Sequence, residues 1–270
     1  MVPKRSTVGR SSRTPIKHFL LDQIVGKIAG ALGTGNVPCK PNPFYVVDLC
    51  GGDGRETKLH QASPIILHKH CQWMRNKRGK ASVLDVIELH EGTFEELQGN
   101  VSHLDGYGDW MTTICDDSRN FTLPPMKPDQ AAFVHCDPNT VDQTPLTGPM
   151  VESWNIFTTY LVTLGCNVGG LKMLPLDKRA VWFDYVDLLC NHLPRHHDAV
   201  LFWLNRDASQ WAYLLSIPRK WSESFSEYAV RKTSNSWERG VSAASFRFDR
   251  RSFNDNIRRL FLRGDEYGEC

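Results

Sequence analysis

A glycine-rich turn directly follows an apolar run near the start of the chain. Residues 46–55 read V-V-D-L-C-G-G-D-G-R, so three glycines, Gly51, Gly52 and Gly54, come shortly after the acidic Asp48. Glycines let the backbone turn tightly and approach a ligand with no Cβ atom in the way. The dinucleotide fingerprint G-x-G-x-x-G/A is not completed, because Thr57 stands where its third small residue belongs. The turn predicts a ligand-binding loop of another kind, with a purely structural turn as the alternative.

Acidic residues close three further apolar runs. Glu88 lies near the end of the run 82–89, Asp116 follows 111–115, and Asp137 follows 131–136. Ligands of open α/β sheets bind outside the carboxyl ends of the strands, so we expect these acids and the glycine turn to share one edge. Each acid alone could be a solvated residue or an ordinary strand exit, and Asp117 beside Asp116 could be a helix cap. In this order along the chain they predict one site.

The D-x-x-G-G-x-G arrangement of Asp48 and the three glycines resembles motif I of class I S-adenosylmethionine (SAM) methyltransferases. The resemblance implies that the glycines wrap the amino-acid end of SAM and that Asp48 orients its ammonium group. It also implies that Glu88 accepts hydrogen bonds from both ribose hydroxyls, a bidentate task that suits a carboxylate. Asp116 would lie near the adenine amino group.

The segment Ala62-Ser63-Pro64-Ile65-Ile66 narrows this resemblance. It is similar to the G-S-P-L-x segment of three-Cys-motif partner proteins and of the related large-subunit ribosomal RNA adenine-N6 methyltransferases. Those proteins share an order of glycine turn, S-P helix start, strand ending in Glu and strand ending in D-P, which this chain repeats over residues 44–140. Residues 145–270 carry no motif that we can match.

Asp137-Pro138-Asn139-Thr140 stands where amino-group methyltransferases carry [D/N/S]-P-P-[Y/F/W]. The resemblance implies that Asp137 and the Pro138 carbonyl hold the target amino group, with the Asn139 amide supplementing them. Asn139 replaces the second proline, and Thr140 replaces the aromatic residue that stacks on a flipped base. Without an aromatic residue at 140, the base-stacking half of an adenine site is missing or supplied elsewhere, so the SAM fold is better supported than adenine as the target.

Alternating strands and helices must position these residues. We expect strands at 44–49, 82–89, 111–115, 131–136, 199–204, 211–217 and 243–248, and helices at 14–33, 63–79, 93–98, 150–164 and 177–193. Thr14-Pro15 and Ser63-Pro64 each offer a helix N-cap followed by proline, and Gly33 and Gly79 would end those two helices. The alternation predicts a Rossmann-like α/β fold, a mostly parallel seven-stranded sheet with helices on both faces and an N-terminal helical extension.

Basic residues gather at both ends of the chain. Residues 1–13 are rich in Ser, Arg and Lys without apolar periodicity, which predicts a flexible basic arm before a single domain over 14–270. Arg251, Arg258 and Arg259 belong to a C-terminal arginine cluster interleaved with phenylalanines, a composition suited to phosphate contact and base stacking. Solvated termini are the alternative. We expect these ends to bind DNA or RNA.

Composition excludes several classes of protein. Of the 270 residues, 41% are hydrophobic and 23% charged, which argues against a disordered, collagen-like or fibrous chain. No stretch approaches the roughly 20 apolar residues that span a bilayer, and no apolar segment of a secretory signal follows the basic N-terminus. The eight cysteines form no C-x-x-C pair, and His68, His70 and Cys71 lack structural zinc spacing. We expect reduced thiols, no metal site and a cytoplasmic location.

Together these patterns predict a SAM-dependent methyltransferase that acts on a nucleobase amino group in DNA or RNA. Its catalysis would consist mainly of in-line positioning and of accepting charge as the amine is alkylated. Two alternatives stay open. One is a catalytically inactive SAM-fold accessory protein that binds nucleic acid or a protein partner, and the other is a methyltransferase of small molecules or proteins. The oligomeric state does not follow from the sequence.

Overall fold

The structure, a computed structural model, describes residues 14–35, 43–56, 61–137, 158–164, 197–206, 209–218, 221 and 245–248. Contacts divide the chain into two compact units, the first ending at His135 and the second beginning at Cys136. The expected single domain over residues 14–270 stays a prediction. The basic arm at residues 1–13 lies outside the described residues.

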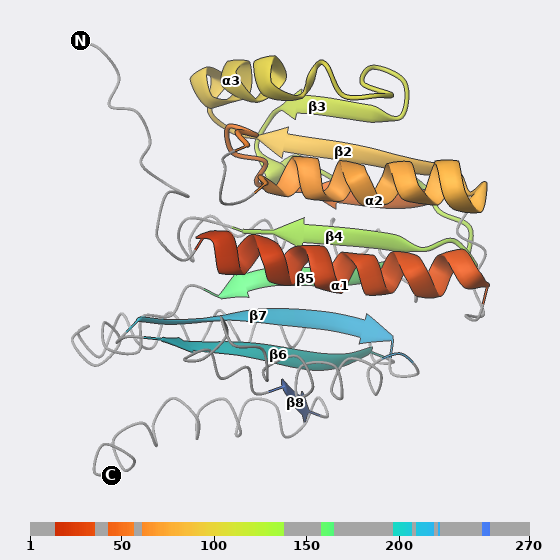
Figure 1. Cartoon of the computed structure of the whole chain (residues 1–270), viewed down its shortest axis with the longest axis vertical. Coiled ribbons are helices and arrows are strands. Elements are labelled where there is room, and N and C mark those ends of the chain that lie inside the picture. The colour runs from red at the N-terminus through yellow and green to blue at the C-terminus, as the bar shows by residue number, and fades with distance from the viewer. Residues whose placement is uncertain are drawn as a thin grey trace. The chain divides into compact units, whose positions relative to one another are not determined.

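Four parallel strands form the sheet of the first unit: β1 (Phe44–Asp48), β2 (Ser82–Glu88), β3 (Met111–Cys115) and β4 (Ala132–Cys136). The arrows of β2, β3 and β4 point the same way in Figure 1. Their order is β3-β2-β1-β4, with β1 hydrogen-bonded to both β2 and β4. All of β4 and most of β1 are buried, which agrees with their near-continuous apolar sequences. In this register Asp48 lies beside Val86 of β2 and His135 of β4.

Three α-helices belong to the same unit: α1 (Thr14–Thr34), α2 (Ser63–Arg78) and α3 (Glu91–Val101). The buried stripe of α1 has the three- and four-residue spacing of an amphipathic helix and consists of Leu21, Ile24, Val25, Ile28, Ala29 and Leu32. α1 packs beside α2 on one face of the sheet (Figure 1). The predicted N-terminal helix is therefore present, and its being an extension of a larger fold stays a prediction.

Glycines of α1 allow the two helices to approach closely. A Cβ atom on Gly26 would lie 2.9 Å from His70 Cε1, and one on Gly33 would lie 3.0 Å from Arg78 Cγ. Gly33 does not end the helix as predicted, because α1 continues to Thr34 and Gly35 takes the positive φ of 72°. Gly33 is therefore a packing residue, and the next glycine along the chain provides the helix end.

The ends of α2 agree with the sequence prediction in part. Gly79 ends the helix with a φ of 60°, and its N–H donates to the Arg75 carbonyl. The predicted cap at the other end is wrong, since the N-cap residue is Ala62 and makes no side-chain hydrogen bond. Ser63 is already inside the first turn, where Pro64 is tolerated because its missing N–H would have no helical partner.

The second unit contains four described strands: β5 (Thr158–Leu164), β6 (His197–Arg206), β7 (Ser209–Pro218) and β8 (Ser245–Phe248). β7 pairs antiparallel with β5 and with β6, and β8 pairs antiparallel with β6. The predicted parallel sheet is therefore confirmed for the four strands of the first unit. A total of seven mostly parallel strands is not confirmed.

The helix predicted over 150–164 is wrong for residues 158–164, which form β5. The segment reads T-T-Y-L-V-T-L, and its β-branched and aromatic side chains favour a strand over a helix. The helix predicted over 177–193 lies outside the described residues. The strands predicted at 199–204, 211–217 and 243–248 are observed as β6, β7 and β8 with shifted ends.

The contact between α1 and α2 includes a pH-dependent pair. Asp22 Oδ1 accepts hydrogen bonds from His70 Nε2 at 2.8 Å and from Lys69 Nζ at 3.5 Å. The hydrogen bond from His70 is the main reason why the pKa of Asp22 is lowered, against the opposing effect of partial burial. A carboxyl group whose pKa falls on folding stabilises the fold above its unfolded pKa. The contribution is lost as the pH falls through the lowered folded pKa.

We expect Asp22→Asn to lower the free energy of unfolding by about 0.5–1 kcal/mol at neutral pH, the scale for a partly exposed pair. The difference from the wild type should shrink as the pH falls through the lowered pKa of folded Asp22, because the wild-type side chain then becomes uncharged as well. Urea unfolding over a pH series measures it, with Asp109→Asn, an exposed aspartate before β3, as control. A difference that is constant down to pH 2 would show that the Asp22 charge contributes nothing.

Candidate cofactor-binding site

The carboxyl ends of β1, β2 and β3 lie at one edge of the first unit's sheet, because the strands are parallel. The arrows of β2 and β3 point the same way in Figure 1. The glycine turn follows β1, and backbone hydrogen bonds join this turn and the end of β3 to the end of β2. Gly51 N donates to the Ile87 carbonyl at 2.8 Å, and Asp116 N donates to the Glu88 carbonyl at 3.2 Å. The glycine turn, Glu88 and Asp116 are therefore neighbours, and ligand binding by them stays a prediction.

The three glycines of the turn serve different purposes. A Cβ atom on Gly51 would clash with Val86 Cγ1, and one on Gly54 would lie 2.7 Å from Leu97 Cδ1 of α3. Gly54 has a φ of 63° and Gly52 a φ of 59°. Apart from Gly52 itself and its two chain neighbours, no atom of the described residues lies within 4 Å of the position that a Gly52 Cβ would take. Gly51 and Gly54 are thus required by packing, whereas Gly52 borders open space where a ligand could lie against the backbone.

Glu88 holds the turn through both oxygens of its carboxylate. Oε2 accepts a hydrogen bond from Gly52 N at 3.0 Å, and Oε1 accepts one from His90 N at 3.0 Å. The residue is only 8% exposed, so these charge-assisted bonds compensate for much of its lost hydration. A carboxylate has about four lone-pair positions, which leaves capacity for two further donors. The side chain therefore shapes the turn and can still accept hydrogen bonds from a ligand.

Side chains of α3 bind the glycine turn on the side away from β2. Asn100 Nδ2 donates to the Asp53 carbonyl at 2.8 Å, and Arg55 Nη2 forms an ion pair with Glu96 Oε2 at 3.1 Å. Asp53 Oδ1 in turn accepts a hydrogen bond from Arg55 N at 3.1 Å. Neighbours from β2 and α3 thus hold the turn in one conformation, which lowers the conformational cost of binding a ligand there.

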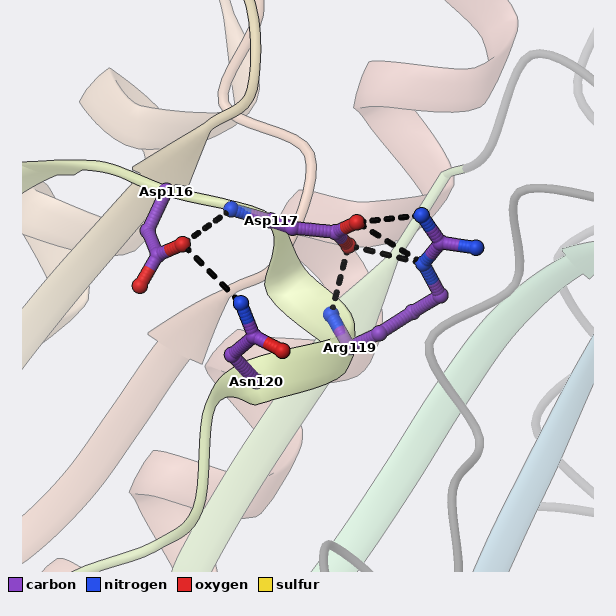
Figure 2. A network of polar contacts seen from close by, with 4 residues as sticks. All are labelled: Asp116, Asp117, Arg119 and Asn120. Carbon is purple, nitrogen blue, oxygen red and sulfur yellow. Dashed lines mark hydrogen bonds and ion pairs between the residues drawn. The ribbon is translucent and has the colours of Figure 1, made fainter.

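Asp116 and Asp117 begin a tight turn after β3 (Figure 2). Asp116 is exposed, and its Oδ1 accepts hydrogen bonds from Asp117 N at 2.6 Å and from Asn120 Nδ2 at 3.2 Å. The second carboxylate oxygen of Asp116 points away from this network in Figure 2. Asn120 therefore restrains the carboxylate while one oxygen stays accessible.

Asp117 is the N-cap of the short 3-10 helix η1 (Ser118–Asn120), the capping role that the sequence left open for it. Its carboxylate accepts a hydrogen bond from Arg119 N at 3.0 Å and pairs with the Arg119 guanidinium. The hydrogen bonds from Arg119 lower the pKa of Asp117. Asp117 is thus committed to the turn, which leaves Asp116 as the acid that can meet a ligand.

Asp48 pairs with a residue that the sequence analysis missed. His135 Nδ1 donates to Asp48 Oδ1 at 2.9 Å, and the two side chains are 2% and 0% exposed. The signal for this pair was a histidine inside the apolar run of β4, opposite an aspartate inside the apolar run of β1. The structure therefore places Asp48 inside the protein, bound to β4 through one of its oxygens.

The other predicted site residues are described only in part. Asp137 is half-buried directly after β4. Pro138 and Asn139 lie outside the described residues, as do three arginines of the predicted nucleic-acid surface, Arg251, Arg258 and Arg259. The binding of a target amino group by Asp137, Pro138 and Asn139 therefore stays a prediction, as does the binding of nucleic acid by the two basic ends of the chain.

The histidines of α2 contact separate parts of the protein. His68 Nε2 lies 2.8 Å from the Asp105 carbonyl and its ring stacks on Trp110, whereas His70 contacts α1 through Asp22. Cys71 is buried, and burial raises the pKa of its thiol to about 12. Within the described ranges, no group of three or more His, Cys, Asp or Glu side chains is placed to hold a metal ion.

Three described cysteines, Cys50, Cys71 and Cys115, are free thiols. In the part of the chain that the structure describes, no helix combines the length and the apolar character needed to span a bilayer. The cytoplasmic location stays a prediction.

Similarity to known proteins is confined to solved structures, since neither a protein-family profile nor a curated protein matches this chain. Protein LPL1258 from Legionella pneumophila is similar with a TM-score of 0.55, covering 87% of this chain and 95% of its own at 12% identity. Cofactor-bound Rv0187 from MTB has a TM-score of 0.50, covering 80% of this chain and 83% of its own at 15% identity.

A more distant likeness is to human methyltransferase 10 domain containing protein, with a TM-score of 0.42 at 10% identity over 74% of this chain and 81% of that protein. At such identities a likeness concerns the fold alone. LPL1258 and Rv0187, together with the parallel strands, show that this chain has an α/β, Rossmann-like fold.

Substitution of the glycines tests how the turn is built. We expect Gly51→Ala to lower the free energy of unfolding by about 1–3 kcal/mol, because the new Cβ has to displace Val86 in a packed interior. Gly99→Ala on the exposed side of α3 is the matched control, and it should be neutral or slightly stabilising. Urea unfolding measures both. Equal stability of the two variants would contradict the packing role of Gly51.

Proposed function

We propose that this chain is a SAM-dependent methyltransferase that acts on an amino group of a nucleobase in DNA or RNA. The observation that carries the proposal is the contact of the Glu88 carboxylate with the Gly52 amide, at the edge where the glycine turn and Asp116 also lie. This contact joins the two motifs that the methyltransferase resemblance assigns to one cofactor.

The residues present fit the methyl donor on three counts. Gly52 borders open space, so a ligand can lie directly against the backbone of the turn. Glu88 retains capacity to accept hydrogen bonds from the two ribose hydroxyls. Asp116 is exposed, and the second oxygen of its carboxylate is available to an adenine amino group. When bound, SAM supplies a methyl group on a positively charged sulfur that leaves readily.

The acceptor side of the reaction is assigned to the residues after β4. Asp137 would accept a hydrogen bond from the target amino group and the Pro138 carbonyl would share this task, with Asn139 supplementing both. Holding the amine in line with the transferred methyl group provides positioning, and the negative Asp137 stabilises the positive charge that develops on the amine. A half-buried carboxylate suits this role, because its charge is less screened than on the open surface.

The composition of the chain ends supports a nucleic-acid substrate. The basic arm at residues 1–13 and Arg251, Arg258 and Arg259 would neutralise phosphates, while the interleaved phenylalanines suit unpaired bases. A methyltransferase of a small molecule or protein would not need these ends.

A second candidate function is a catalytically inactive accessory protein with the same fold. The departures at Asn139 and Thr140 favour it, because the aromatic residue that would stack on a flipped base is missing from the motif. Such a protein could still bind SAM, so only methyl transfer separates the two functions.

We expect Glu88→Ala to weaken SAM binding by about 1–3 kcal/mol, the scale for loss of hydrogen bonds to a charged group. The substitution removes the acceptor for the ribose and also releases the Gly52 amide. Isothermal titration calorimetry measures the affinity, with Glu95→Ala on the exposed side of α3 as control. Wild-type protein that binds no SAM at all would refute the proposed cofactor.

We expect Asp137→Ala to abolish methyl transfer while SAM affinity stays within about twofold of the wild type, since Asp137 serves the acceptor. Single-turnover transfer of a labelled methyl group, with SAM saturating, measures the chemical step on pools of DNA, RNA, protein and small molecules. Wild-type rates in the variant would assign the reaction centre elsewhere. A wild type that binds SAM but methylates no pool would favour the accessory protein, and transfer only to protein or small molecules would refute the nucleic-acid substrate.

A further inference from the structure

The buried pair of Asp48 and His135 has unused hydrogen-bonding capacity. Asp48 Oδ2 and His135 Nε2 are both buried and have no hydrogen-bond partner among the described residues. A buried polar group without a partner costs free energy, and most such groups in proteins are satisfied. Because this one pair contains two such atoms, we expect a ligand to supply the missing hydrogen-bond partner.

The chemistry of the pair indicates what that group is. A carboxylate only accepts hydrogen bonds, so the proton between His135 Nδ1 and Asp48 Oδ1 belongs to the imidazole. Asp48 Oδ2 is therefore a buried acceptor that still lacks a donor. An ammonium group satisfies such an oxygen, because it brings N–H donors and a positive charge to a carboxylate.

The position of the pair connects it to the glycine turn. Asp48 is the last residue of β1, three positions before Gly51, and Leu49 N donates to the His135 carbonyl at 2.9 Å. Asp48 has no exposed surface, so a ligand has to displace the atoms that cover Oδ2. Because Oδ2 has no partner among the described residues, the new contact breaks no hydrogen bond there.

From these observations we infer that His135 is a positioning residue for the amino-acid end of the methyl donor. Through Nδ1 it holds one oxygen of Asp48, so that the other oxygen accepts a hydrogen bond from the donor's ammonium group. The inference rests on the proposed function. It adds His135, which lies outside the motifs found in the sequence, to the residues that recognise the ammonium group of the methyl donor.

A pair of ligands that differ only in the amine tests the inference. S-adenosylhomocysteine carries the ammonium group, and its desamino analogue, 5′-deoxy-5′-(3-carboxypropylthio)adenosine, keeps the carboxylate but lacks the amine. We expect the wild type to prefer the amine-bearing ligand by roughly tenfold or more, the effect of one charge-assisted hydrogen bond. His135→Phe should lose most of this preference, and His135→Asn, whose amide can still donate to Asp48, should retain part of it.

His68→Phe is the matched control, because His68 is also buried in the first unit but binds the Asp105 carbonyl. It should keep the wild-type preference, whereas a merely structural role of His135 would lower the affinity for both ligands equally. A His135→Phe variant that keeps the full preference overturns the inference. Equal wild-type affinity for the two ligands overturns it too and leaves the proposed function intact, while no binding of either ligand refutes both.

A measurement on the unmodified protein covers the case in which His135→Phe does not fold. With the histidine rings labelled with nitrogen-15, we expect the His135 resonances to shift when S-adenosylhomocysteine is added and to shift much less with the desamino analogue. Identical shifts with both ligands would show that the pair does not sense the amine, which would overturn the inference.

Discussion

The contact between the Glu88 carboxylate and two backbone amides is the interaction on which the candidate site depends. A nearly buried negative charge must be hydrogen-bonded, and Glu88 meets this need with Gly52 N and His90 N. The same two bonds join the turn after β1 to the turn after β2. Satisfying one charge therefore fixes the shape of the surface that a ligand would meet.

Packing adds a second constraint to that charge. Val86 and Leu97 leave no room for side chains at Gly51 and Gly54, so the turn lies close against β2 and α3. Asn100 and the pair of Arg55 with Glu96 hold the outer side. Because the glycine turn is held from two sides, it is ordered before a ligand binds. Binding then loses little free energy to ordering of the turn.

Much of the first unit could be predicted from the sequence, because its strands are short apolar runs that end at acids or glycines. The strand 111–115 was predicted with its observed bounds, and 44–48 and 82–88 each differ by one residue from the prediction. β5 was missed because an apolar run of that length fits a helix or a strand, and pairing with β7 decides between them. The role of Gly33 depends on packing against residues distant in sequence. Asp48 and His135 each stand out as a polar residue inside an apolar run, but their pairing depends on the strand register, which neither run indicates by itself.

The shared α/β fold does not by itself establish an activity, because this fold hosts many chemistries. Methyl transfer by this chain therefore requires that the methyl donor binds where the glycine turn, Glu88 and Asp116 meet. The most direct measurement is a nitrogen-15 amide spectrum of the wild-type chain recorded with and without S-adenosylhomocysteine. We expect the largest shifts at Gly52, His90 and Asp117, whose amides contact the Glu88 and Asp116 carboxylates. An unchanged spectrum at millimolar ligand, or shifts that leave these amides unaffected, would contradict binding of the methyl donor at this edge of the sheet.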